Sequence, residues 1–164
     1  MLIILRGNSG SGKSTIAKGL RERLGPHTML VSQDLIRREV LKVKDGPNNP
    51  AVDLLFQVCL YGHAIGYNVI LEGILSAKTY TAMLHKLLEA YPSHLIYYFD
   101  VSFEETLIRH QTKPNAHEFG ENEMREWWHE KDFLHTPEER TIPQDVSLEE
   151  TVDRIIEDYN SQKR

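Results

Sequence analysis

The sequence predicts a three-layer α/β/α protein, in which a five-stranded parallel sheet is covered by helices on both faces. Short apolar segments alternate with helical segments along the whole chain, which is the pattern of a parallel sheet with crossover helices. Residues 95–99 are apolar without interruption, as a strand buried on both faces requires. A glycine-rich turn also joins the first predicted strand to the first predicted helix. These three observations carry the prediction of the fold.

The first half of the chain contains three of the predicted strands and three helices. Apolar residues at helical spacing mark the first helix, which ends at Gly25 and Pro26. A loop rich in Gly, Pro and Asn follows the second helix. The strands are expected at 2–5, 28–32 and 68–73, and the helices at 13–24, 35–41 and 51–65.

The second half contains the other two strands and a polar segment that interrupts the alternation. Pro92 stops one helix and Pro137 breaks another. Residues 111–119 are expected to form a polar loop, and residues 111–136 a helical lid within a single domain that spans 1–164. The strands are expected at 94–101 and 140–143, and the helices at 77–90, 104–110, 121–131 and 148–159.

The composition is that of an ordinary globular protein, with 40% hydrophobic and 26% charged residues. A chain of 164 residues can bury a sizeable core as one domain. No apolar run approaches a membrane span and no signal-peptide pattern is visible, so we expect a cytoplasmic location. The single cysteine, Cys59, lies among apolar residues and is expected to be a buried thiol, which fits a reducing compartment.

The charge balance bears on the class of partner. The formal net charge is -5. A protein that grips a long nucleic-acid backbone usually carries a basic patch or stripe, and none is evident in the sequence. The charge therefore favours a small-molecule partner over nucleic acid, with a local basic groove as the open alternative.

A phosphate-binding motif lies between the first strand and the first helix. Gly7, Gly12, Lys13 and Ser14 fit the pattern G-x-x-x-x-G-K-[ST], in the strand–turn–helix context that the motif requires. Glycine lets backbone N–H groups turn inward around a polyphosphate, and the helix N-terminus adds a positive dipole end. The nucleotide-binding residues are therefore expected to be Gly7, Asn8, Ser9, Gly10, Ser11, Gly12, Lys13, Ser14 and Thr15.

The motif assigns chemistry to two of these side chains. Lys13 is expected to reach the β- and γ-phosphates of ATP, and the Ser14 hydroxyl is expected to ligate Mg²⁺. A flexible glycine turn without a ligand is the alternative. Together with the α/β alternation, the motif predicts a P-loop NTPase fold that binds ATP and Mg²⁺.

Polar side chains follow the predicted strands at the sheet edge where open parallel sheets place their active sites. Asp34 is expected to be a catalytic base that orients and deprotonates a hydroxyl acceptor, and it could cap the following helix as well. Arg37 is expected to hold an anionic substrate group or to brace Asp34, with a solvated surface residue as the alternative. Glu72 is expected to act on Mg²⁺ or to position the substrate. Asp100 is expected to cap the next helix.

Basic residues flank the polar part of the expected lid. Arg109, Lys113 and Arg125 could neutralise charge on a transferring phosphoryl group while the lid excludes water. Arg109 is the strongest candidate because it lies where the lid would hinge, and we assign it a catalytic role; a solvated charged surface is the alternative. Trp127 and Trp128 are expected to pack the lid onto the core.

The phosphate loop followed by Gln33-Asp34-Leu35-Ile36-Arg37 resembles the P-loop kinases that include polynucleotide 5′-hydroxyl kinases, zeta toxins and chloramphenicol phosphotransferase. In polynucleotide kinases an Asp after the second strand is the base, and an Arg three residues further on contacts the substrate. The resemblance places these roles on Asp34 and Arg37. The strand that ends at Glu72 and the basic lid around Arg109 are also similar to those of small P-loop kinases.

These observations favour an ATP-dependent phosphotransferase that moves the γ-phosphate to a hydroxyl of a small-molecule acceptor. One alternative is a kinase that acts on a 5′-hydroxyl nucleic-acid end or a tRNA-linked acceptor. Another is a nucleotide-dependent regulator without an acceptor. The sequence names neither the acceptor nor the oligomeric state.

Overall fold

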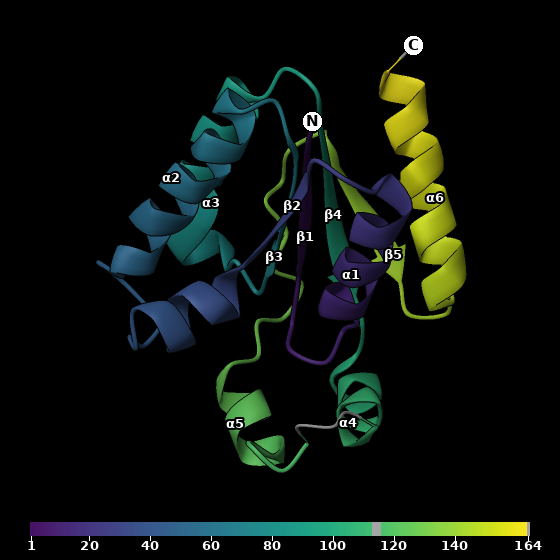
Figure 1. Cartoon of the computed structure of the whole chain (residues 1–164). Coiled ribbons are helices and arrows are strands. Elements are labelled where there is room, and N and C mark those ends of the chain that lie inside the picture. Colours follow the sequence, from purple (N-terminus) through teal and green to yellow (C-terminus); the bar gives the residue numbers. More distant parts are fainter. Residues whose placement is uncertain (113–115, 164) are drawn as a thin grey trace.

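The computed structural model describes residues 1–112 and 116–163 and is built around a parallel sheet, seen edge-on in Figure 1. In the described residues the sheet has five strands: β1 (Leu2–Gly7), β2 (Thr28–Ser32), β3 (Asn68–Gly73), β4 (His94–Asp100) and β5 (Glu139–Pro143). Their order is β2-β3-β1-β4-β5, and each neighbouring pair is parallel. The predicted fold class is confirmed, and the carboxyl ends of all five strands share one edge of the sheet.

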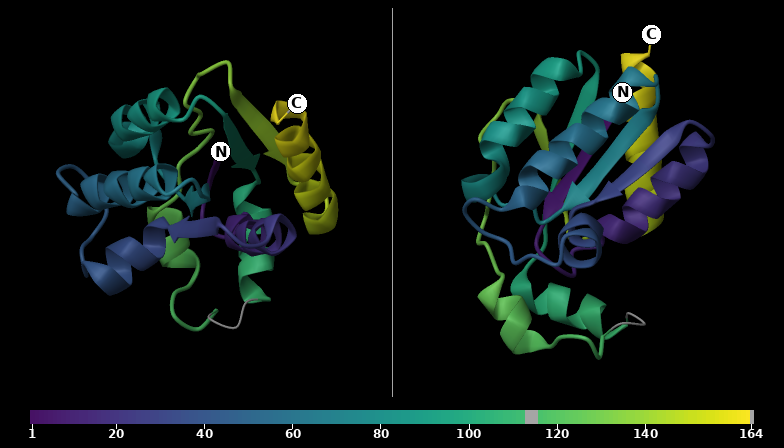
Figure 2. Two further views of the ribbon diagram at one scale, coloured as in Figure 1. Left: turned by 45° about the horizontal axis from the view of Figure 1, so that its top comes forward. Right: turned by 60° about the vertical axis from the view of Figure 1, so that its left-hand side comes forward.

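Helices cover both faces of the sheet and give the three predicted layers. One face carries α1 (Lys13–Leu24) and α6 (Leu148–Gln162), and the other carries α2 (Pro50–Ala64) and α3 (Ala77–Ala90). Figure 2 shows the same separation from two further directions. Within the described residues, no helix is both long and apolar enough to cross a membrane.

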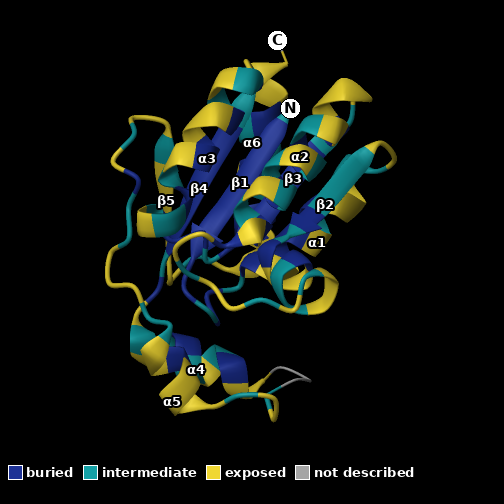
Figure 3. Cartoon of the chain, turned by 90° about the vertical axis from the view of Figure 1, so that its left-hand side faces the viewer, coloured by how far each residue is buried: buried dark blue, intermediate teal, exposed yellow. Residues whose placement is uncertain are grey.

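The two faces of the sheet form two separate apolar cores because successive side chains of a strand point to opposite sides. Ile3 and Leu5 of β1 join the core under α1 and α6, whereas Leu2 and Ile4 join the core under α2 and α3. Figure 3 shows the buried strands enclosed by helices whose outer surfaces are exposed. The buried position predicted for Cys59 is confirmed.

β1 extends beyond the predicted 2–5 and includes Arg6 and Gly7. Arg6 is fully buried and pairs with two carboxylates, Asp132 at 3.1 Å and Glu139 at 2.6 Å. Its guanidinium also donates two hydrogen bonds to the Leu75 carbonyl. The charge and the hydrogen bonds of this buried strand residue are thus satisfied by partners from distant parts of the chain.

A short helix, η1 (Leu35–Val40), follows β2 where residues 35–41 were expected to be helical. Its hydrogen bonding is of the π type, because the Leu41 N–H donates to the Ile36 carbonyl five residues earlier at 3.0 Å. The helix therefore makes less than two turns before the chain enters the loop that leads to α2.

Two further helices, α4 (Phe103–Gln111) and α5 (Glu121–Glu126), lie together beyond the carboxyl edge of the sheet, next to the loop between β1 and α1 (Figures 1 and 2). The N-cap of α4 is Ser102, whose hydroxyl accepts from the Glu105 N–H, so the capping role expected of Asp100 is wrong. Asp100 instead accepts a hydrogen bond from the Lys131 ammonium at 2.6 Å.

The helix expected at 121–131 ends at Glu126. Lys131 has a φ of 44°, which lies outside the helical region. The physical reason is a distant partner: the side-chain amide of Asn8 binds both the N–H and the carbonyl of His129. A helical path would use these two groups in its own hydrogen bonds, so the helical spacing of 127–131 does not determine their structure.

Candidate active site

The loop between β1 and α1 has the backbone geometry that a phosphate-binding loop needs. Gly12, directly before α1, has a φ of 100°, and Gly10 has a φ of 83°, both in the region that glycine adopts without strain. A Cβ atom on Gly10 would also come within 2.7 Å of the Thr106 carbonyl of α4. Glycine at these positions therefore allows both the turn and the close approach of the loop to α4.

Lys13 is almost fully buried inside this loop, with 6% of its surface exposed. Its ammonium donates to the Asn8 carbonyl at 2.7 Å and to the Ser11 hydroxyl at 3.1 Å. The positive charge is thus held at the centre of the loop, beside the N-terminus of α1. A lysine ammonium and a helix N-terminus in one place form an anion-binding arrangement.

Ser14 and Glu72 meet at the carboxyl edge of the sheet. The Ser14 hydroxyl donates to Glu72 Oε2 at 3.1 Å. Strand register explains the contact, because Glu72 of β3 lies opposite Leu5 of β1, two residues before β1 ends at Gly7. A hydroxyl and a carboxylate side by side are hard oxygen donors, which suit Mg²⁺.

Asp34 follows β2 on the other side of β3. Ser32, two residues earlier, lies opposite Glu72 in the sheet register, so the chain after β2 leaves the same edge as the phosphate loop. The Asp34 side chain is 60% exposed. Its carboxylate accepts from Arg37 at 3.2 Å and lies 3.8 Å from Arg38. The bracing of Asp34 by Arg37 that the sequence suggested is therefore present, and Asp34 stays open to solvent.

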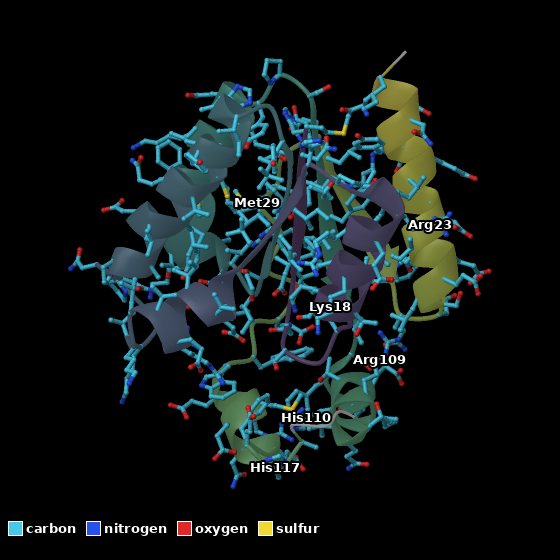
Figure 4. The ribbon with its side chains drawn as sticks, in the orientation of Figure 1. Lys18, Arg23, Met29, Arg109, His110 and His117 are labelled. Carbon is cyan, nitrogen blue, oxygen red and sulfur yellow. The ribbon has the colours of Figure 1, made fainter. Side chains whose placement is uncertain are left out.

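Arg109 contacts the outer side of the phosphate loop. Its guanidinium donates to the Ser11 carbonyl at 3.2 Å, to the Gln144 carbonyl at 2.8 Å and to the Glu105 carboxylate at 2.7 Å. Figure 4 shows Arg109 between α4 and the ends of α1 and α6. The arginine thus ties α4 both to the loop and to the segment that precedes α6. Of the other basic lid residues, Lys113 lies outside the described residues.

Arg38 makes a contact that the sequence analysis missed. Its guanidinium lies 5.2 Å from the centre of the Trp127 ring and 5.6 Å from that of Phe119. Trp128 instead packs edge-on against Phe103 of α4 at 5.2 Å. Trp127 therefore packs on η1 through Arg38, and Trp128 packs on α4. Two features of the sequence could have predicted this contact: an arginine one helical turn after Asp34, and aromatic residues in the predicted lid.

Gln33, next to Asp34, is a buried structural residue. Its amide group donates to Asp45 and to the Tyr80 hydroxyl, both at 3.0 Å, and accepts from the Leu75 N–H at 2.9 Å. The Tyr80 hydroxyl in turn donates to Asp45 at 2.9 Å. Burial, together with the neighbouring Asp45 carboxylate, raises the pKa of Tyr80 well above its ordinary value. This network fixes the backbone from which Asp34 projects.

The fold and the loop geometry define a class: this is a P-loop kinase fold. The APS kinase of Mycobacterium tuberculosis, solved with AMPPNP and APS, superposes with a TM-score of 0.73 at 17% identity, covering 95% of each chain. A gluconokinase from Sinorhizobium meliloti gives 0.63 at 17% identity, covering 99% of this chain and 97% of its own. The shikimate kinase of Aquifex aeolicus gives 0.56 at 20% identity, covering 99% and 98%. At such identities the likeness establishes the fold alone.

The family of the chain follows from its sequence. A family model described as an AAA domain matches residues 2–131, and the chain belongs to this family. The matched residues include the phosphate loop, Asp34, Glu72 and Arg109. Comparison with curated proteins found no match.

Proposed function

We propose that this protein is an ATP-dependent phosphotransferase that moves the γ-phosphate of ATP to a hydroxyl group of a small-molecule acceptor. One observation carries the proposal: an exposed, arginine-braced carboxylate follows the strand next to the Ser14–Glu72 pair of a phosphate loop. A nucleotide-binding loop alone would serve a switch equally well. A carboxylate at the same edge of the sheet gives the nucleophile an acceptor for its proton.

Each residue has a role in the proposed reaction. Lys13 exchanges its contacts within the loop for oxygens of the β- and γ-phosphates. Asp34 accepts the proton of the attacking hydroxyl and orients it toward the γ-phosphorus. Arg109, at the junction of α4 and the loop, adds positive charge where the equatorial oxygens become more negative, once it releases its present carbonyl partners.

The residues at the loop suit a magnesium ion that accompanies ATP. Ser14 would ligate the ion through its hydroxyl, and Glu72 would hold it directly or through water. When bound, the ion neutralises charge on the phosphates. The Ser14–Glu72 hydrogen bond keeps both oxygens at one position before the ion arrives.

The test is ADP release from Mg²⁺-ATP with a panel of hydroxyl acceptors: nucleosides, sugars, aminoglycosides, chloramphenicol-like compounds and 5′-hydroxyl oligonucleotides. Asp34→Asn should lower the transfer rate about 10²–10⁴-fold, the usual contribution of a general base. Nucleotide affinity should stay unchanged, because Asp34 lies outside the loop. The matched control is Glu39→Gln, which removes a carboxylate from η1, the short helix that follows Asp34. Full transfer activity in Asp34→Asn would refute the assigned mechanism.

A second candidate function is phosphorylation of a nucleic-acid end. The contact between Asp34 and Arg37 favours it, because the resemblance to polynucleotide kinases places base and substrate contact on this pair. The oligonucleotide arm of the panel decides between the two, and steeply salt-dependent binding would support nucleic acid. Tight nucleotide binding with no product from any acceptor would favour the regulator instead.

A further inference from the structure

The side chain of Asn8 joins the phosphate loop to a segment far away in the sequence. Its amide nitrogen donates to the His129 carbonyl at 2.7 Å, and its amide oxygen accepts from the His129 N–H at 2.9 Å. Only 5% of Asn8 is exposed. Two hydrogen bonds to one residue fix both the distance and the orientation of the two segments.

His129 lies within residues 111–136, the segment that the sequence predicts to be a lid. Trp127 and Trp128, just before it, contact Arg38 of η1 and Phe103 of α4. Asp132, just after it, is anchored to the buried Arg6 of β1. The contact with Asn8 therefore falls between a segment packed against η1 and α4 and a segment fixed to the sheet.

The backbone of Asn8 takes part in the loop itself. Its carbonyl accepts from the Lys13 ammonium at 2.7 Å and from the Ser11 N–H at 3.3 Å. In the proposed reaction a phosphate group takes up Lys13, which would draw the ammonium away from this carbonyl. A shift of the Asn8 backbone would also shift His129, because the side chain of Asn8 is hydrogen-bonded to the His129 backbone.

Asparagine is suited to this contact for a chemical reason. Its planar amide presents one donor group and one acceptor next to each other, which matches the carbonyl and the N–H of a backbone residue. Aspartate would offer two acceptors and face the His129 carbonyl with negative charge. A hydrophobic residue would leave both groups of His129 without a partner.

We propose that Asn8 is a positioning residue that couples nucleotide binding in the phosphate loop to the position of the lid. This inference rests on the proposed nucleotide binding and adds to it the path by which the lid responds. A ligand shifts a conformational equilibrium only as far as it favours one state over the other. In this proposal, nucleotide bound in the loop changes the position of the lid through the Asn8–His129 hydrogen bonds.

The two tryptophans of the chain, Trp127 and Trp128, directly precede His129 and provide the probe. Mg²⁺-AMPPNP should change the tryptophan emission of the wild-type protein. In Asn8→Ala that change should be lost even at nucleotide concentrations that calorimetry shows to be saturating, so that every molecule of the variant holds Mg²⁺-AMPPNP when its emission is read. Asn160→Ala, an exposed asparagine of α6, is the matched control and should behave as wild type.

Hydrogen exchange of the protein without nucleotide is the second measurement. The His129 amide, which loses its acceptor in Asn8→Ala, and its neighbours in 127–131 should exchange about tenfold faster, as loss of a hydrogen bond predicts. Asn8→Ser, a milder change, should give an intermediate rate and serves if Asn8→Ala does not fold.

The outcomes separate this inference from the proposed function. A wild-type protein that does not bind Mg²⁺-AMPPNP would refute the proposed function. If the nucleotide binds but leaves the wild-type emission unchanged, or changes the emission of Asn8→Ala equally, the coupling is refuted and nucleotide binding stands. Once an acceptor is found, Asn8→Ala should lower kcat more than it raises the KM for ATP.

Discussion

Arg6 illustrates how one residue holds several elements together. Its guanidinium is fully buried and contacts Leu75, before α3, as well as Asp132 and Glu139. Glu139 is itself almost fully buried, with 3% of its side chain exposed. Two carboxylates at such a position are tolerable only because the cation is there.

Replacement of Arg6 should therefore be strongly destabilising. Arg6→Met removes the cation and leaves the two carboxylates without their partner, which should cost about 3–5 kcal/mol of unfolding free energy. For a chain of this size the Tm should fall by about 10 °C in a thermal melt. Arg23→Met is the matched control, because the ion pair of Arg23 with Asp153 is half-exposed. It should change the free energy of unfolding by less than about 1 kcal/mol, and an equal effect of the two variants would contradict this account.

Cys59 gives a prediction about pH and reactivity. Burial raises the pKa of the Cys59 thiol to about 12. The folded state thus favours the protonated thiol over the thiolate. The stability that comes from burying the protonated thiol is fully present below the ordinary thiol pKa and is lost as the pH rises toward 12. At pH 8 the native protein should not react with a thiol reagent such as DTNB, whereas one thiol should react in urea. Rapid labelling of the native protein would contradict the burial of Cys59.

At the scale of elements, the contact of Arg38 with Trp127 and Phe119 holds these two residues against η1. Arg38→Gln should loosen the segment from residue 116 to 127, because a cation over two aromatic rings contributes about 0.5–2 kcal/mol. Hydrogen exchange of residues 116–127 should speed up. Arg38→Lys keeps the charge and should have a smaller effect. Unchanged exchange in Arg38→Gln would show that other contacts hold this segment.

The predicted helix at 121–131 shows what local pattern can and cannot determine. The helical spacing is correct up to Glu126, where neighbours along the chain decide the structure. From Trp127 onward the deciding partner is Asn8, whose hydrogen bonds with His129 span 121 positions of the sequence. No pattern within a short window contains that information.

At the scale of the whole molecule, features decided by neighbours along the chain were predicted from the sequence, whereas features decided by distant partners were not. The phosphate loop is a local pattern, so its position and its glycine geometry could be read directly from the sequence. The strand alternation predicted a parallel sheet, whereas the register that brings Glu72 beside Leu5 depends on pairing between distant segments. The two carboxylate partners of Arg6 lie 126 and 133 positions away, so a charged residue directly after a predicted apolar strand was the one visible sign of them.

Nucleotide binding should stabilise the whole molecule, because the loop connects β1, α1 and α4. Mg²⁺-AMPPNP at about 100 times its Kd should add about 2.7 kcal/mol to the unfolding free energy, which corresponds to a Tm increase of about 5–10 °C. Lys13→Ala should abolish most of this increase, since the ammonium lies at the centre of the loop. Lys18→Ala, an exposed lysine of the same helix, should leave it unchanged.

Chelation of the metal separates the contributions of the loop and of the Ser14–Glu72 pair. With EDTA the backbone N–H groups and Lys13 still bind phosphate, so a smaller Tm increase should remain. Glu72→Gln should show that smaller increase even with Mg²⁺ present, because the carboxylate that holds the ion is gone. If the increase were identical with and without Mg²⁺ in the wild-type protein, the Ser14–Glu72 pair would have a structural role, and the nucleotide would be bound by the loop alone.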